Sequence, residues 1–330
     1  DDDYEFYSQA ALDNDGNIYF AGYEEGKNSR LYKIVDKDYR GENVWNNKGN
    51  DLHGDKATAP AISKDNKLYI ADNNGYIYSF LTQGSYGEAI KIWEKKISNN
   101  SFNASPIIAE DGSIYIADHA GKFYVLKANG KLLGSVNLFS DPISSSAIID
   151  QNGKVFIGNE QGDLFKINPE VLKDPDVEND PDKISLISPF DPLEVSDKAL
   201  SSPALAENNT LYINSRDGNL YALDANSGEN IWNKEFNTDN AIYSNPGIDE
   251  NGFIHIASTD TYLYSIHGNS SGPANTPWPM YGSDKYNTGR RDYNSSGNKP
   301  YIILIPINYT PDIEDGKLEI AEYSTMELIF

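Results

Sequence analysis

Residues 201–236 read SSPALAENNTLYINSRDGNLYALDANSGENIWNKEF, and the plan of the whole chain can be worked out from this stretch. Two short runs in it, TLYIN and NLYALD, correspond to KLYIAD and YIYSF of another unit, which show the period-two alternation of β-strands. An Asn or a Gly comes just before each run, and both residue types accept the left-handed backbone of a tight hairpin turn. The stretch therefore predicts four short antiparallel strands, beginning at SPAL and ending at NIWNKEF.

The same unit recurs six times when the chain is aligned on the aromatic position of its second strand. These anchors are Tyr19, Tyr69, Tyr115, Phe156, Tyr212 and His255. Gly or Asn stands three positions before each anchor, and Ala or Pro stands nine positions before it. The spacing of the anchors is close to the roughly 40 to 50 residues of a four-stranded propeller blade. The repeat predicts an all-β protein, a β-propeller of six four-stranded blades, or of seven if the C-terminal tail completes a partial blade.

The positions within each unit predict roles. The strand with the Ala or Pro is expected to lie innermost, where the blades crowd the axis, and the aromatic anchors are expected to pack between neighbouring blades. His255 is expected in the core for the same reason. Four tryptophans follow the second aromatic residue of their units at similar spacings, so each is expected to mark a fourth strand: Trp45, Trp93, Trp232 and Trp278.

The repeat resembles that of the pyrroloquinoline-quinone-like (quinoprotein) β-propellers, in which Ser-Pro leads to a Tyr-bearing strand and then to Gly-x-Leu-Tyr-Ala-Leu-Asp, Gly and Trp. Residues 277–290, PWPMYGSDKYNTGR, resemble a segment found beside such propellers. The resemblance covers residues 8–290 and implies a fold more strongly than an activity. Dehydrogenases of this family are longer and hold the quinone with Ca²⁺, a Trp and often a vicinal Cys pair.

This chain has no Cys, and its four Trp are explained by the repeat. We therefore expect a member of the non-enzymatic branch, with no catalytic, cofactor-binding or metal-binding residues. A dehydrogenase that depends on the quinone and Ca²⁺ is the alternative. The turns at residues 13–16 (DNDG) and 249–252 (DENG) are weak candidates for Ca²⁺, because sister units carry KDNK and ENNT at the same place.

Composition limits the classes of binding partner and the cellular location expected for this chain. The chain carries 27 basic and 50 acidic residues, a net charge of −23, which disfavours nucleic acid and anionic lipid. The longest apolar run, at residues 301–307, is far below the roughly 20 residues that span a bilayer. A chain that opens on Asp1 without Met is expected to be an exported, extracellular or cell-surface protein whose signal peptide has been removed. Six sequons are candidate N-glycosylation sites: Asn99, Asn103, Asn208, Asn269, Asn294 and Asn308.

Three segments follow from these patterns. Residues 1–290 form the propeller, interrupted by an acidic, Pro-rich insertion at 169–199. Residues 291–300 form a linker, and residues 301–330 form a tail of β-strands. The tail is expected to pack on its own propeller, to begin an immunoglobulin-like domain, or to be donated to another copy. Its apolar residues are the candidate subunit contacts: Tyr301, Ile302, Ile303, Leu304, Ile305, Ile307, Leu318, Ile320, Leu328 and Phe330.

The function expected from these features is that of a non-catalytic surface scaffold or adhesion protein. Its partners would be copies of itself, joined through the tail into a filament or layer. A second alternative is a glycan-binding module that uses loops at one mouth of the propeller, with Phe102 and Tyr243 as ligand contacts.

Overall fold

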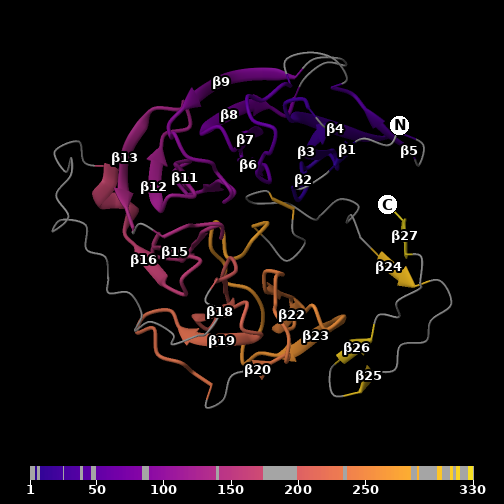
Figure 1. The fold of residues 1–330 in the computed structure, drawn as a ribbon, viewed down its shortest axis with the longest axis vertical. Helices are drawn as coiled ribbons and strands as arrows, with labels where there is room; N and C mark the ends of the chain where they lie inside the picture. Colours follow the sequence, from indigo (N-terminus) through magenta and orange to yellow (C-terminus); the bar gives the residue numbers. More distant parts are fainter. Residues whose placement is uncertain are drawn as a thin grey trace.

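The computed structural model describes residues 4–5, 8–24, 26–37, 40–45, 50–83, 89–138, 141–173, 199–232, 236–283 and 288–289, and four short strands after residue 300. Six β-sheets form a ring (Figure 1), which confirms the predicted propeller of six blades. Most of the predicted insertion (174–198) and the predicted linker (291–300) lie outside the described residues.

Three strands of each blade follow the predicted repeat. The innermost strands are β2 (Ala11–Leu12), β6 (Ala61–Ile62), β10 (Ile107–Ile108), β14 (Ile148–Ile149), β17 (Ala204–Leu205) and β21 (Gly247–Ile248). The second strands, which carry the anchors, are β3 (Ile18–Glu24), β7 (Lys67–Ala71), β11 (Ile114–Ala117), β15 (Val155–Gly158), β18 (Thr210–Asn214) and β22 (Phe253–Ala257). The third strands are β4 (Arg30–Lys37), β8 (Tyr76–Leu81), β12 (Lys122–Leu126), β16 (Leu164–Ile167), β19 (Asn219–Asp224) and β23 (Tyr262–His267).

The outer position is filled differently from blade to blade. Four blades use the next segment of the chain: β5 (Arg40–Asn43), β9 (Ile90–Lys96), β13 (Leu132–Asn137) and β20 (Phe236–Asn237). The fourth blade has three described strands, and the 3₁₀ helix η1 (Pro169–Lys173) follows β16. In the sixth blade the outer strand is β26 (Lys317–Glu319), from the tail.

The remaining strands extend sheets or pair outside the ring. β1 (Tyr4–Glu5) pairs with the end of β3, and β25 (Ile313–Glu314) pairs with β26. β24 (Ile303–Pro306) and β27 (Met326–Ile329) form a separate two-stranded sheet. Figure 1 shows the yellow tail strands at the rim of the ring, between β23 and the N-terminal blade.

The prediction that each Trp marks a fourth strand is correct for Trp93 and wrong for Trp278. Trp93 lies in the fourth strand β9, while Trp45 and Trp232 lie just outside β5 and β20. Trp278 lies in no fourth strand, because the chain turns from the sixth blade to the propeller axis, where the Trp278 carbonyl accepts a hydrogen bond from Ile149 N at 2.8 Å. A Trp in or near a fourth strand and a Trp at the axis follow the second aromatic residue at similar spacings. The spacing therefore could not distinguish Trp278 from the other three.

The hairpin turn before each anchor adopts the predicted backbone. The six residues three positions before the anchors all have a positive φ, between 59° and 80°. They are Gly16, Asn66, Gly112, Gly153, Asn209 and Gly252. Gly adopts this backbone freely and Asn does so more readily than other L-residues, so the turn explains the recurring residue types.

One turn of the sixth blade departs from this rule and predicts a stabilising substitution. The turn between the second and third strands has a left-handed Gly in blades two to five, but Thr261 (φ 77°) occupies it in blade six. A β-branched residue in this conformation is strained, so Thr261→Gly should raise the free energy of unfolding by about 1 kcal/mol. Urea unfolding followed by circular dichroism measures the change.

The reciprocal variant Gly218→Thr is the control for this prediction. A Cβ at Gly218 would lie 2.6 Å from Asn240 O, so this variant should be destabilised. A loss of stability in Thr261→Gly would show that the turn is not strained.

Hydrogen bonds and apolar contacts join the blades around the axis. Backbone N–H groups ten positions before the anchors donate to the side chain at the same position in the next blade: Ala59 to Ser105 (3.1 Å), Ser105 to Ser146, Ser146 to Ser202, and Ser202 to Asn245 (each 2.8 Å). Buried apolar clusters join every pair of consecutive blades, from the first and second to the fifth and sixth. Among the described residues, none of these clusters joins the sixth blade to the first.

Candidate functional site

Residues 277–283 and 288–289 lie at the axis of the propeller, and together we call them the axial segment. Its backbone carbonyls accept hydrogen bonds of 2.7 to 2.8 Å from innermost strands of four blades: Leu12 N to Thr288 O, Ile62 N to Gly289 O, Ile149 N to Trp278 O, and Leu205 N to Pro279 O. The Tyr281 side chain forms a hydrogen bond with Ser105 of blade three, and burial raises the pKa of Tyr281. The axial segment therefore connects five of the six blades at the centre of the ring.

The space left beside the axial segment is very small. Residues at and just before the innermost strands of blades one to four, with Trp278 and Tyr281, line a cavity of about 10 Å³, enough for one water molecule. A fused three-ring quinone does not fit there.

The first carboxyl group of each candidate Ca²⁺ turn accepts hydrogen bonds from its own hairpin. Asp13 accepts hydrogen bonds from Asn17 N at 2.9 Å and from the Tyr19 hydroxyl at 2.7 Å. Asp249 accepts from Phe253 N at 2.9 Å and lies 3.3 Å from His255 Nε2. Across the residues that the structure describes, no three His, Asp or Glu side chains converge on a common point. These contacts fit the interpretation of both segments as hairpin turns.

His255 corrects one expectation. It occupies the anchor position of the sixth blade, but its side chain is 41% exposed instead of packed in the core. Its ring replaces the Tyr hydroxyl as the partner of the Asp six positions earlier, which explains why an imidazole is accommodated here.

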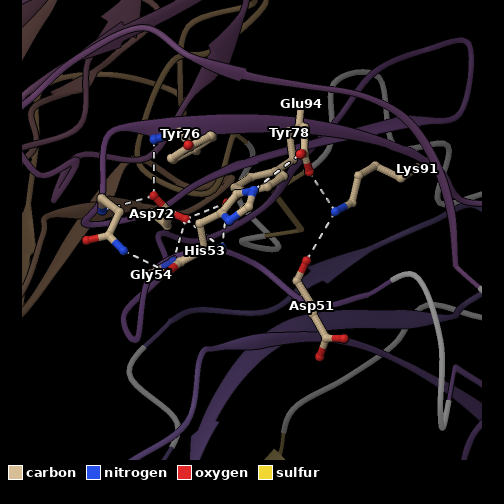
Figure 2. A network of polar contacts seen from close by, with 9 residues as sticks. Asp51, His53, Gly54, Asp72, Tyr76, Tyr78, Lys91 and Glu94 are labelled. Carbon is tan, nitrogen blue, oxygen red and sulfur yellow. Dashed lines mark hydrogen bonds and ion pairs between the residues drawn. The ribbon is translucent and has the colours of Figure 1, made fainter.

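The face of the propeller that carries the turns between second and third strands also carries the connections between blades. Adjacent strands are antiparallel, so the ends of the second and fourth strands lie on this same face, which we call the loop face. Figure 2 shows its organisation in blade two, where Asp72 joins the turn after β7 to the connection that enters the blade. The fully buried Asp72 accepts hydrogen bonds from His53 N (3.1 Å), Gly54 N (2.7 Å), Asn74 N (3.0 Å), Tyr76 N (3.1 Å) and the Tyr78 hydroxyl (2.5 Å).

Aspartate and tyrosine recur as a pair on this face. Asp118 accepts from the Tyr124 hydroxyl at 2.8 Å, and Asp260 accepts from that of Tyr264 at 2.5 Å. Burial and the neighbouring carboxyl raise the pKa of Tyr124 to about 12. The signal was present in the sequence as an Asp four or six positions before the second aromatic residue, and sequence reasoning did not use it. These pairs are structural, because the carboxyl groups are occupied by several donors.

The exposed part of the network in Figure 2 is an ion-pair cluster on the outer side of blade two. Glu94 Oε1 lies 3.2 Å from His53 Nε2, and Glu94 Oε2 accepts from Lys91 Nζ at 2.8 Å. The Lys91 bond lowers the pKa of Glu94. The His53 ring packs on Tyr76 with centroids 4.2 Å apart. The cluster joins β9 to the connection between blades one and two, which contains His53, and this is a structural role.

The two predicted mouth residues have different environments. Phe102 is 2% exposed and packs edge-on against Tyr124, so its ring belongs to the core. The prediction of Phe102 as a ligand contact is wrong, because the loop folds its ring inward under the turn after β11. Tyr243 is 65% exposed on the loop face, with the Arg216 guanidinium 5.4 Å from its ring centroid. Its role as a ligand contact stays a prediction.

The predicted contact residues of the tail are divided among three strands. Ile303, Leu304 and Ile305 lie in β24, Leu318 in β26, and Leu328 in β27. Tyr301, Ile302, Ile307, Ile320 and Phe330 lie outside the described residues. β26 pairs with β23 in the register Tyr262↔Glu319, Leu263↔Leu318 and Tyr264↔Lys317. This pairing places one part of the tail on its own propeller.

Four of the six predicted sequon asparagines are described, and all four are exposed: Asn99, Asn103, Asn208 and Asn269. Asn294 and Asn308 lie outside the described residues. Asn208 Nδ2 donates to Asn269 O at 3.0 Å, so these two sequons lie side by side. Glycosylation at these positions stays a prediction. In the described part of the chain, no helix is long and apolar enough to cross a bilayer.

Comparisons with known proteins match the repeat and the ring. A family model described as outer membrane protein assembly factor BamB matches residues 185–267. No curated protein matches the sequence at a significant level. Among solved structures, BamB from Moraxella catarrhalis is similar at 16% identity, with 82% of this chain and 73% of that chain covered and a TM-score of 0.55.

Two further structural neighbours have different activities. Catalytically inactive virginiamycin B lyase from Staphylococcus aureus, solved with quinupristin, is 12% identical, with 82% and 85% of the two chains covered and a TM-score of 0.60. Chaetomium thermophilum Sqt1, bound to the N-terminus of ribosomal protein L10, is 11% identical, with 77% and 70% covered and a TM-score of 0.57. At these identities the likeness shows the fold alone. Together with the family match, it confirms the predicted resemblance to pyrroloquinoline-quinone-like propeller repeats.

Proposed function

For this propeller of pyrroloquinoline-quinone-like repeats, we propose the function of a non-catalytic binding scaffold, exported to the cell surface, whose C-terminal strands join copies of the chain. The non-catalytic part is supported by the filled axis and by aspartates whose oxygens are taken up by turns and tyrosines. Structural neighbours include a propeller bound to another protein, which supports a role in protein–protein contact.

The observation that carries the assembly proposal is the origin of the outer strand in blade six. In blades one, two, three and five the fourth strand follows the third after a short connection, the longest of which runs from Asp224 to Phe236. In blade six, β23 ends at His267 and β26 begins only at Lys317. The outer strand of this blade is thus a separately tethered segment, and such a segment can serve a neighbouring copy as well as its own propeller.

The apolar character of the tail supports the same proposal. Residues 301–307 read YIILIPI, and residues 326–330 read MELIF. In the described residues β24 and β27 pair only with each other, and an isolated two-stranded sheet is marginally stable in water. Covering such strands with those of another copy would remove apolar surface from water and bring the copies together.

Export is supported by indirect features. The matching family model is described as an outer membrane protein assembly factor, the chain has no Cys, and four sequons lie on exposed positions. A charge of −23 would keep the outer surface of such a scaffold hydrated and limit nonspecific association.

Truncation of the tail tests the proposal. The chain of residues 1–330 and a chain ending at Lys299 are compared by light scattering and negative-stain microscopy. We expect the full chain to form defined oligomers or filaments and the shortened chain to be a monodisperse monomer. Two monomers would refute the assembly role of the tail.

A charge-matched pair of full-length variants separates pairing from simple repulsion. Ile303→Asp with Ile305→Asp places two charges on β24, while Ser295→Asp with Asn298→Asp places the same two charges in the predicted linker. We expect assembly to be lost only in the first variant. Equal loss in both would point to repulsion between acidic copies.

A further inference from the structure

Among the described residues, the tail pairs with only part of the outer edge of β23. β26 pairs with three of its six residues, Tyr262 to Tyr264, while the inner edge pairs with β22 over five positions. The edge is available because the chain after His267 leaves the sheet and enters the axis. The blade therefore presents a defined acceptor edge, completed by a short strand that arrives on its own tether.

The tether is long enough to reach another molecule. Gly289 is the last described residue of the axial segment, and β26 begins at Lys317. Fully extended, the chain between them spans on the order of 90 Å. A folded chain of this size has a radius of gyration of only about 20 Å. A hairpin connection would force the outer strand back onto its own blade, but this tether imposes no such constraint.

We propose that the edge of blade six is an exchange site between copies, at which Lys317–Glu319 of one copy pairs with Tyr262–Tyr264 of another in the register Leu263↔Leu318. The proposal rests on the proposed function, since it names the surface through which the tail acts. The occupant is a second copy of this chain, because the strand that fits the edge within one molecule is present unchanged in every other copy.

The balance between the two arrangements depends on concentration. The hydrogen bonds are the same in both arrangements, so the connection between strand and propeller decides the balance. A segment joined to its own acceptor edge has an effective concentration of about the millimolar range within one molecule. Exchange becomes dominant where copies are crowded, as in a surface layer. One-way donation from copy to copy leaves an edge and a strand at opposite ends and forms a filament, whereas reciprocal donation forms a closed dimer.

The net charge adds a dependence on salt. Two copies of charge −23 repel each other, and the Debye length falls from about 30 Å at 0.01 M salt to about 8 Å at 0.15 M. Pairing within one molecule does not bring two acidic propellers together. Raising the salt concentration should therefore increase exchange between copies.

Engineered disulfides test the register without background, because the chain has no cysteine. Full-length Leu263→Cys and full-length Leu318→Cys, the latter with a mass tag, are mixed at high concentration and oxidised mildly. We expect a heterodimer of the two on a non-reducing gel, with a yield several-fold above that of Leu263→Cys mixed with Met326→Cys. Met326 lies in the tail but pairs with Pro306, so it reports random collision.

The outcomes separate this inference from the proposed function. Heterodimers that increase with protein concentration and with salt support exchange at this edge. Equal yields from the two mixtures, while the full chain still assembles and the chain ending at Lys299 does not, would overturn the exchange site and leave the scaffold role standing. Oxidation of the double variant Leu263→Cys, Leu318→Cys to an intramolecular disulfide at every concentration would also overturn it.

Discussion

Trp278→Ala is expected to lower the free energy of unfolding by about 3–5 kcal/mol, as measured by urea denaturation followed by far-UV circular dichroism. Trp278 is 3% exposed and packs among buried residues of blades two, three and four. Its removal leaves a cavity where these blades meet. The neighbouring carbonyl contacts to Ile149 and Leu205 would be loosened with it, because they are made by the same short segment.

Trp232→Ala is the matched control for this prediction. Trp232 is partly buried beside Tyr212 near the outer strand of blade five, so the same chemical change there should cost clearly less. Equal losses for the two tryptophans would contradict the role of the axial segment in joining blades. A broadened or two-step transition in Trp278→Ala alone would indicate that blades unfold separately once the axis is weakened.

Asp72→Ala should reduce the free energy of unfolding by roughly 3–4 kcal/mol, since it leaves buried donors without an acceptor. Asp72 accepts four backbone N–H groups and the Tyr78 hydroxyl, and it is fully buried. Alanine has no side-chain acceptor and cannot replace any of these bonds. The loss is measured by the same urea titration.

Two variants show whether the number of donors determines the cost of losing Asp72. Tyr78→Phe keeps Asp72 but removes a hydroxyl that donates to Asp72 and accepts from His53 N, so a loss of about 1–2 kcal/mol is expected. Asp217→Ala removes the half-buried counterpart in blade five, which accepts from Asn219 and the Tyr221 hydroxyl, and should cost less than Asp72→Ala. If Asp217→Ala were as damaging as Asp72→Ala, the number of buried donors would not be the deciding factor.

The candidate ligand contacts at the propeller mouth and the candidate contacts of the tail could be predicted only in part from the sequence. An exposed Tyr243 and a buried Phe102 both stand in polar loops between blades, and nothing in either loop's composition separates them. Their difference arises from how each loop folds over the turn of the following blade. Likewise, the predicted tail residues include Leu318, whose partner Leu263 lies far earlier in the chain and is specified by no local pattern.

The repeat, the register of three strands in every blade, and the left-handed turns at Gly16, Asn66 and their four counterparts could all be predicted from the amino-acid sequence. These are local properties, because a tight turn and an alternating strand impose the same residue types wherever they occur. The place of Trp278 in the axis and the completion of blade six by Lys317–Glu319 emerged only from the folded chain. Both depend on which backbone edges remain open after the blades have formed, and that is a property of the assembled ring.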